Sequence, residues 1–491
     1  MKFYLSGHYF DYESRNALRI FDLNVVCEIE KLEDAKFMSF DSEYTLCSNL
    51  EEQEGTFTST ASLFRGKKLL FSSAVSSRDI LLETEDEKKM KKVLVEKAIH
   101  SVLKRHYNAV PDYGILTGVR VVKILLYARQ NKRTNGEINR ILMDTYEVTE
   151  EKTKLLWDIL HAEEKYVDPE KNKNSYNLYI GIPFCPTKCV YCSFTSFVHF
   201  RENTLESYLD TLIFEIQSTI QMAIEKGLKL HTIYVGGGTP SVLSEKQIDR
   251  LFDCLRKFYN LSDIEEITFE AGRPDTITPV KLDCLKKNGV TRISINPQTM
   301  NEETLKSMGR LHKPSDILEA YKAARIAGFD INMDMILGLP GETKEDVKNT
   351  ITEIVKLMPE NITVHSLAYK KKSELTKEST KLDKDYDLIK HMHDEVMEAC
   401  RGKGYKPYYM YRQKNIKGNS ENVGYALHGK ESIYNMVIIE ELETILACGI
   451  GASSKIMLES NRHEPVRNFK SIEEYLGRID EIIEKKRNLL S

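Results

Sequence analysis

Three cysteines in one short stretch carry the clearest chemistry in this sequence. Cys185, Cys189 and Cys192 form a C-x3-C-x2-C pattern directly after an apolar run, and Pro183 and Pro186 keep the loop out of regular structure. Thiolates bind iron-sulfur clusters, and three cysteines on a four-iron cluster leave one iron open to a further ligand. We therefore expect a 4Fe-4S cluster bound by these three cysteines.

Two other interpretations of this loop stay open. The cysteines could pack as small hydrophobic residues that lie close together by chance. A zinc site is the sharper alternative, but it needs a fourth Cys or His at close spacing. The nearest downstream candidate is His199, seven residues after Cys192, and the sequence contains no second C-x2-C pattern.

Composition restricts the class of protein. A chain of 491 residues with 41% apolar and 29% charged residues predicts two or three globular domains. The net charge of -4 does not suit nucleic-acid binding, and we expect no membrane span and no signal peptide. The other cysteines share no spacing, which argues against disulfides and favours a reducing, cytoplasmic location. They are Cys27, Cys47, Cys254, Cys284, Cys400 and Cys448.

The pattern of residue types predicts three domains. Residues 1 to about 85 contain strand-like runs, for example 36–40 and 68–71, and residues 87–166 have helical spacing. A charged stretch at 168–175 reads as a linker. We expect an N-terminal α+β and helical domain over 1–167, a central domain over 168–375 and a C-terminal substrate-covering domain over 376–491.

The central domain alternates strand and helix six times, which predicts a parallel sheet with helices outside it. The expected strands are 178–182, 232–235, 266–270, 292–295, 331–337 and 362–367. The expected helices include 205–224, 245–259, 280–288, 315–327 and 344–358. Six units are fewer than the eight of a closed barrel, so the fold class is α/β with a partial (β/α)6 TIM-type barrel, an N-terminal α+β domain and a C-terminal α/β extension.

Residues suited to chemistry follow the expected strand ends, where parallel barrels place their active sites. The cysteine loop follows the first strand, and the second ends in three glycines that would let a ligand reach backbone N–H groups. The other strands end in polar or glycine-rich segments. These positions are Gly236, Gly237, Gly238, Glu270, Asn296, Gln298, 338–342 and His365.

The cysteine loop, followed by Gly-Gly-Gly-Thr-Pro-Ser at 236–241, resembles the radical S-adenosylmethionine (SAM) superfamily. With residues 308–312 and 334–343, it resembles the oxygen-independent coproporphyrinogen III oxidase group over roughly 175–370. Residues 116–120 and 449–455 extend the resemblance to the coproporphyrinogen dehydrogenase (HemZ) subgroup. The resemblance implies that the methionine amine and carboxylate of SAM bind the open iron, and that an electron cleaves SAM to a 5'-deoxyadenosyl radical.

The resemblance also implies roles for individual residues. Cys185, Cys189 and Cys192 would bind the cluster. The remaining residues would bind SAM, with Gly237 and Gly238 at the methionine amine, Glu270 at the ribose or amine, Arg310 at the carboxylate, and Gln298 and Asp334 at the nucleoside. Tyr179, Tyr191 and Thr239 complete this predicted cofactor-binding set.

The implied reaction removes hydrogen from the β-carbon of a substrate propionate, followed by loss of carbon dioxide and of one electron. Two such events convert coproporphyrinogen III to protoporphyrinogen IX and require an electron donor and an acceptor. Two positions depart from the oxidase pattern: Gly181 stands where His is usual, and Phe194 where a further Cys is usual. Radical methyl transfer and ring opening of heme, or heme delivery without catalysis, are therefore alternatives.

Two C-terminal segments bear on the tetrapyrrole ligand. The heme-delivery branch carries a His-Asn-x-x-Tyr-Trp motif, and the nearest segment here, 428–434, does not match it. An aromatic and basic segment could either line a tetrapyrrole site or form a surface strand with a hydrated basic edge. It contains Tyr405, Tyr408, Tyr409, Tyr411, Arg412, Lys414 and Lys417.

Overall fold

The computed structural model describes most of the chain. The described residues are 1–22, 25–31, 42–118, 120–198, 200–370, 373–375, 386–458 and 462–490. The expected strand at 36–40 and the candidate ligand His199 lie outside them. The chain forms two compact units, of which the first contains Met1–His161 and Met410–Glu421 and the second most of the chain from Ala162 onward.

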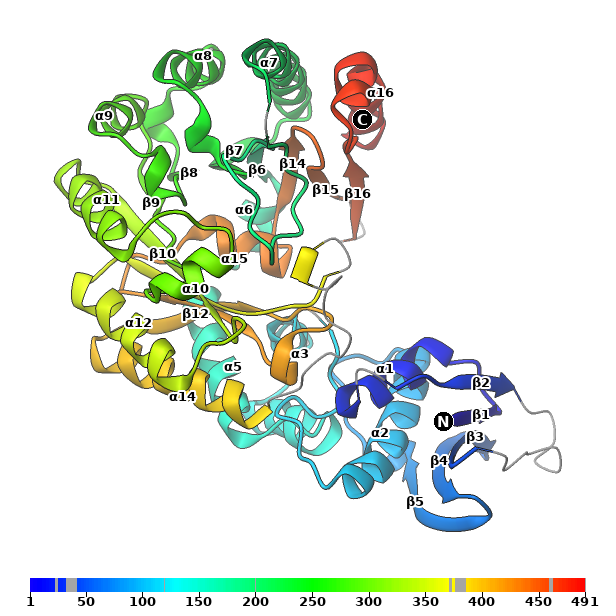
Figure 1. The fold of residues 1–491 in the computed structure, drawn as a ribbon. Coiled ribbons are helices and arrows are strands. Elements are labelled where there is room, and N and C mark those ends of the chain that lie inside the picture. Colours follow the sequence, from blue (N-terminus) through cyan, green and yellow to red (C-terminus); the bar gives the residue numbers. More distant parts are fainter. Residues whose placement is uncertain are drawn as a thin grey trace. The chain divides into compact units, whose positions relative to one another are not determined.

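A five-stranded sheet and two helices form the N-terminal part of the first unit (Figure 1). Its strands, in spatial order, are β2 (Glu28–Lys31), β1 (Lys2–Ser6), β3 (Tyr44–Gln53), β4 (Thr56–Arg65) and β5 (Lys68–Ser76). The helices α1 (Asp11–Phe21) and α2 (Glu87–Tyr107) pack their apolar residues on this sheet, where Leu18, Leu46, Leu63, Leu94 and Ile99 are fully buried. The expected strand at 68–71 is confirmed as the start of β5.

Further helices follow α2, as the helical spacing after residue 87 predicts. They are α3 (Val122–Gln130), α4 (Asn135–Arg140), α5 (Glu150–Glu163) and α6 (Pro169–Lys173). No helix in the described part of the chain is long and apolar enough to cross a bilayer.

The second unit is built on an eleven-stranded sheet whose central six strands are parallel and follow chain order. These six are β6 (Ser175–Ile182), β7 (Lys229–Gly237), β8 (Glu266–Glu270), β9 (Arg292–Ser294), β10 (Asp330–Leu337) and β11 (Asn361–Ser366). All six expected strands are therefore confirmed, with ends that differ by a few residues.

The five expected helices of this unit are also confirmed and lie along the outer side of the sheet in Figure 1. They are α7 (Glu202–Glu225), α8 (Glu245–Arg256), α9 (Pro279–Lys287), α11 (Pro314–Ile326) and α12 (Lys344–Leu357), with the short α10 (Glu302–Ser307) before α11. Local sequence fixes where several of them begin. Ser244 with Gln247 and Thr343 with Asp346 form capping boxes that satisfy the first backbone N–H groups of α8 and α12.

Strands from the last quarter of the chain extend the same sheet at both edges. The additional strands are β12 (Lys406–Tyr411), β13 (Asn422–Ala426), β14 (Thr444–Cys448), β15 (Ser453–Met457) and β16 (His463–Arg467), and the helices are α14 (Tyr386–Gly402), α15 (Ile433–Glu440) and α16 (Ile472–Leu490). β14 runs parallel to β6, with Ala447 opposite Tyr179. The division into three domains with boundaries at residues 167 and 375 stays a prediction.

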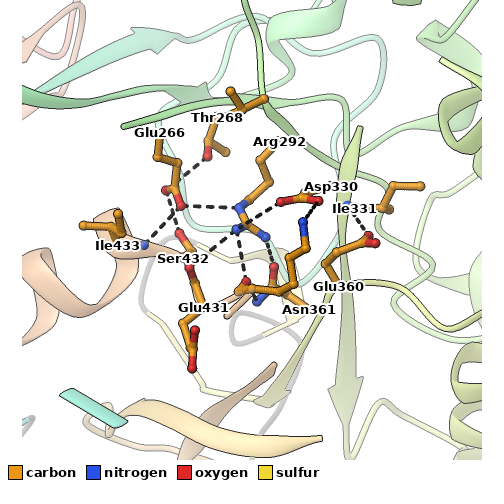
Figure 2. Close-up of polar contacts among 12 residues, drawn as sticks. Glu266, Thr268, Arg292, Asp330, Ile331, Glu360, Asn361, Glu431, Ser432 and Ile433 are labelled. Carbon is orange, nitrogen blue, oxygen red and sulfur yellow. Dashed lines mark hydrogen bonds and ion pairs between the residues drawn. The ribbon is translucent and has the colours of Figure 1, made fainter. Parts of the chain in front are cut away.

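A polar network joins the N-terminal ends of β8 to β11 to the segment before α15 (Figure 2). Each of these strands begins with a polar residue: Glu266, Arg292, Asp330 and Asn361. The buried Arg292 guanidinium lies 3.4 Å from the Glu266 carboxylate and donates to the carbonyl oxygen of Lys430 at 3.1 Å. The segment that fails to match the heme motif therefore serves as a structural partner of the strands.

A buried ion pair joins α16 to α7, and its loss should cost stability. Lys486 Nζ lies 2.7 Å from Glu215 Oε1, and both side chains are 0% exposed. Lys486→Met leaves the Glu215 charge buried without its cation, so we expect the free energy of unfolding to fall by about 3–5 kcal/mol. Urea unfolding followed by circular dichroism measures this change.

The neighbouring Arg487 provides a matched control. Its pair with Glu484 is 2.8 Å long, but both side chains are 56% exposed. Exposed pairs contribute about 0–1 kcal/mol because water screens them, so Arg487→Met should lie in that range. Equal losses in the two variants would contradict a special role for the buried pair.

Candidate cofactor site

The cysteine loop is held in place by backbone hydrogen bonds after β6 ends. Phe197 N donates to Pro183 O at 2.7 Å and Cys185 N donates to Phe197 O at 3.0 Å, so the loop returns to its own start. A turn closes between Cys189 and Cys192, whose N donates to Cys189 O at 3.0 Å. All three cysteines are half-buried and make no disulfide.

The three thiols lie near enough to influence one another. Burial raises the pKa of Cys185 and of Cys192, and the neighbouring thiols raise both further because like charges repel. Among the described residues, no three His, Cys, Asp or Glu side chains converge on a point where one metal ion could bind. A four-iron cluster needs no such convergence, because each thiolate binds a different iron.

The glycines at the end of β7 lie directly against the start of the cysteine loop. A β-carbon at Gly238 would be 2.9 Å from Cys185 Sγ and 2.7 Å from Phe184 O, so no larger residue fits without displacing the loop. Thr239 extends this contact, since its hydroxyl donates to Cys185 Sγ at 3.4 Å and its N donates to Phe184 O at 2.8 Å.

The expectation that these glycines offer free N–H groups to a ligand is wrong. Gly238 N donates to Ile182 O at 2.8 Å, and Gly237 N donates to Glu270 Oε2 at 3.2 Å. Their N–H groups bond within the protein because the two loops pack so closely. The methionine amine of SAM, which is predicted to bind here, is itself a hydrogen-bond donor, so it would need an acceptor such as a carbonyl oxygen and not an N–H group.

Glu270 ends β8 and is poised to change charge near neutral pH. Its carboxylate accepts from the Tyr234 hydroxyl at 2.6 Å as well as from Gly237 N. Burial raises the pKa of Glu270 to about 7, and the charge of Asp334 adds to this, although both hydrogen bonds oppose it. A buried carboxyl group with a raised pKa that lies near a group of cysteines is typical of a functional site.

Gln298, four residues after the end of β9, lies beside Asp334 in the middle of β10. Gln298 has a φ of 64°, an uncommon conformation for a residue other than glycine, and its N donates to Asp334 O at 2.9 Å. Its side chain is 8% exposed, and Oε1 has no hydrogen-bond partner among the described residues. Asn332 Nδ2 donates to Asp334 Oδ1 at 2.7 Å. A ligand that donates hydrogen bonds would satisfy the buried Gln298 oxygen.

Arg310 lies beside the cluster loop, but it is partly engaged already. Its Nη1 donates to Asn296 O at 2.5 Å and its Nη2 to Gly272 O at 3.4 Å, while Nε has no partner in the described part of the chain. Burial lowers the pKa of Arg310, but Tyr191 and Cys189 outweigh this and raise it overall. For Arg310 to bind a carboxylate through two parallel N–H···O hydrogen bonds, these contacts would have to change.

The two predicted tyrosines have different neighbours. Tyr179, on β6, stacks on Tyr234 with ring centroids 6.1 Å apart. Tyr191 packs against a small apolar cluster that includes Met308, Leu339 and Leu367. The prediction that both contact SAM stays a prediction.

Tyr234 and Tyr434 belong to this region, although the sequence analysis did not name them. Their rings stack with centroids 4.4 Å apart and an angle of 22°. Tyr234 could have been found, because residues two apart on a strand share a face and Tyr234 precedes Gly236 by two. Nothing near Tyr434 in the sequence marks it.

The aromatic and basic C-terminal segment is not a hydrated surface edge at its buried members. Arg412 donates from Nε to Ser420 O at 3.2 Å and from Nη2 to Asn419 O at 2.8 Å, so its guanidinium bonds within the protein. The interpretation of this segment as a tetrapyrrole lining stays a prediction. Five of its side chains are buried. They are Tyr405, Tyr408, Tyr409, Arg412 and Lys417.

Comparison with known proteins identifies the family of this chain. The Radical SAM superfamily profile matches residues 179–354. The chain is 41% identical over 362 residues to the "Oxygen-independent coproporphyrinogen-III oxidase-like protein HemZ" of Bacillus subtilis strain 168, covering 73% of this chain and 72% of that protein. The chain therefore belongs to the radical SAM superfamily, in the HemZ-like family of oxygen-independent coproporphyrinogen-III oxidase-like proteins.

Other relatives match a smaller part of the chain. The "Heme chaperone HemW" of the same organism is 36% identical over 197 residues, covering 40% of this chain and 51% of that protein. The solved structure of coproporphyrinogen III oxidase (HemN) from Escherichia coli, described as a radical SAM enzyme, has a TM-score of 0.50 and 23% identity. The match covers 65% of this chain and 72% of that one, and it shows a shared fold.

Proposed function

We propose that this chain is a radical SAM oxidoreductase that carries out the oxygen-independent oxidative decarboxylation of coproporphyrinogen III propionates toward protoporphyrinogen IX. The 41% identity over 73% of the chain with a protein called coproporphyrinogen-III oxidase-like is the observation that supports this most. The activity would belong to porphyrin and heme biosynthesis in the cytoplasm.

The residues of the site suit a 4Fe-4S cluster and SAM. Cys185, Cys189 and Cys192 would hold the cluster, and the packing of Gly238 on Cys185 would fix the loop against the cofactor. When bound, these groups would supply a 5'-deoxyadenosyl radical that removes a hydrogen atom from the substrate. The substrate radical then loses carbon dioxide and gives one electron to an external acceptor, while an external donor reduces the cluster.

The remaining site residues would bind and orient SAM. Glu270 as a carboxylate would accept a hydrogen bond from the amine or ribose, and the unpartnered Gln298 oxygen would accept one from the nucleoside beside Asp334. Arg310 would stay charged beside Cys189 and attract the methionine carboxylate. Tyr179, Tyr191, Gly237, Gly238 and Thr239 would surround the same ligand.

One experiment separates this function from its alternatives. Anaerobically reconstituted protein is incubated with SAM, a reductant and coproporphyrinogen III, or with heme in place of the porphyrinogen. A vinyl-bearing product together with 5'-deoxyadenosine supports the proposal. A methylated or ring-opened product from heme indicates an enzyme that acts on heme. Tight heme binding without turnover indicates delivery, the function that the name of the HemW relatives describes.

A further inference from the structure

A pocket of about 300 Å³ lies beside the cysteine loop, and the two departures from the oxidase pattern, Gly181 and Phe194, both line it. Ligand pockets span about 300–1,000 Å³, so this pocket suits one part of a large ligand rather than all of it. The other lining residues come from β6, β7, the cysteine loop, α15 and the β14–β15 region, and they include Tyr179, Tyr434 and Ile438.

The lining of this pocket is mostly apolar, and its polar side-chain groups are the hydroxyls of Tyr179, Thr195, Tyr434 and Ser453. None of the described residues that line the pocket carries a charge. Tyr434 is 3% exposed, and it contributes its aromatic ring to the wall. Burying a carboxylate here would be unfavourable because no cation would balance it. The lining instead suits an uncharged group that packs against an aromatic ring and aliphatic side chains.

Hydrogen bonds from the start of α15 to Glu266, at the N-terminal end of β8, fix the position of Tyr434. Glu266 accepts hydrogen bonds from the Ser432 hydroxyl at 2.8 Å and from Ile433 N at 3.1 Å, which holds the first turn of α15 (Figure 2). A carboxylate at a helix N-terminus is favourable because it meets the free N–H groups there. The Tyr434 ring then stacks on Tyr234, whose hydroxyl binds Glu270. The pocket wall is therefore a built feature.

Gly181 keeps the other side of the pocket free of a side chain. A β-carbon there would lie 3.3 Å from Cys448 O and 3.4 Å from Tyr179 Cε1, so a larger residue is crowded against the neighbouring strand. The position that is usually His in the oxidases thus offers no hydrogen-bonding side chain in this chain. The ligand group at this place must be recognised by shape.

We propose that this pocket receives one methyl-bearing, carboxylate-free edge of the tetrapyrrole, and that Tyr434 and Ile438 select for it. The inference rests on the proposed function, which supplies the tetrapyrrole. Each ring of coproporphyrinogen III has one methyl and one propionate group, so the substrate can present an uncharged edge. Uroporphyrinogen III, which has a carboxylate at every ring position, has no such edge.

A change of charge in the pocket tests this selection. Cluster-containing protein without reductant is equilibrated anaerobically by dialysis with coproporphyrinogen III or uroporphyrinogen III, and the bound pigment is measured after oxidation. We expect native protein to bind coproporphyrinogen at least about tenfold more tightly, since one buried unpaired carboxylate costs more than 1.4 kcal/mol. Ile438→Lys should reduce the ratio of the coproporphyrinogen affinity to the uroporphyrinogen affinity about tenfold, because the lysine ammonium can pair with a carboxylate.

Two further variants keep the test decisive if Ile438→Lys folds poorly. Ile438→Met conserves volume and charge, so it should keep the native ratio. Tyr434→Ala should weaken coproporphyrinogen binding about fivefold, because it removes the ring that forms this wall. Unchanged binding in Tyr434→Ala and an unchanged ratio in Ile438→Lys would overturn the pocket proposal while the proposed function stands. Native protein that binds neither tetrapyrrole would overturn both.

Discussion

Replacing Cys185, Cys189 and Cys192 together by alanine should remove the iron-sulfur cluster and abolish cleavage of SAM. The three thiols are the half-buried sulfurs of one loop, and Cys189 lies near enough to the other two to raise the pKa of both, so we expect them to act as one ligand set. Without thiolates the loop offers the irons no ligand of suitable softness. Iron and sulfide content and the visible absorption of the reconstituted protein measure the loss.

A fourth cysteine serves as the control for this variant. Cys27 is also half-buried but belongs to the first unit and forms no part of the loop. Cys27→Ala should retain full iron content and full formation of 5'-deoxyadenosine. If the triple variant kept native iron content, the cluster assignment would be wrong, and with it every role proposed for SAM.

Glu270→Gln should weaken SAM binding about 10- to 100-fold, because hydrogen bonds to a charged group contribute about 1.5–3 kcal/mol. In native protein, SAM affinity should rise with pH through about 7, where Glu270 becomes a carboxylate. The Gln variant cannot ionise at this position, so its affinity should stay flat over the same range. Titration of the reduced cluster with SAM, followed by electron paramagnetic resonance, gives both results.

A second buried glutamate tests whether this pH dependence belongs to Glu270. Burial also raises the pKa of Glu342 to about 7, and Glu342 accepts a hydrogen bond from Thr299. Glu342→Gln should leave the pH dependence of SAM binding intact. If SAM affinity were independent of pH in Glu342→Gln but depended on pH as in native protein in Glu270→Gln, the titrating group would be Glu342 and not Glu270.

The same shift sets the sign of the effect on stability. Because the pKa of Glu270 is higher in the folded chain than its ordinary value of 4.5, the folded state binds the proton more tightly. Its contribution is therefore most favourable below pH 4.5 and falls as the pH rises to about 7. Without SAM, Glu270→Gln should accordingly unfold at higher urea concentration than native protein at pH 8.

Local patterns predicted the central strands and the elements that carry the site. Apolar runs of strand length, separated by helical spacing, were enough to find β6 to β11, because strands buried on both faces are apolar throughout. Cys185 and Glu270 were found because each follows or ends such a strand. These signals lie within a few residues of the feature that they predict.

Features that depend on distant partners could not be predicted. Glu266 caps α15 across more than 160 positions of sequence, and no local pattern marks either partner. The engagement of the Gly237 and Gly238 N–H groups depends on how closely two loops pack, which spacing does not specify. The burial of Arg412 likewise follows from its tertiary contacts.

The pairing of β6 with β14 has a consequence for the order of folding. Tyr179 meets Ala447, so the strand that leads into the cysteine loop lacks one neighbour until the ribosome has made the last part of the chain. Contacts between residues so far apart in sequence form slowly, because closing a long loop lowers the entropy of the chain before the new contacts stabilise it. The edge of β6 is therefore open to solvent throughout most of synthesis, and the wall of the adjacent pocket is completed last.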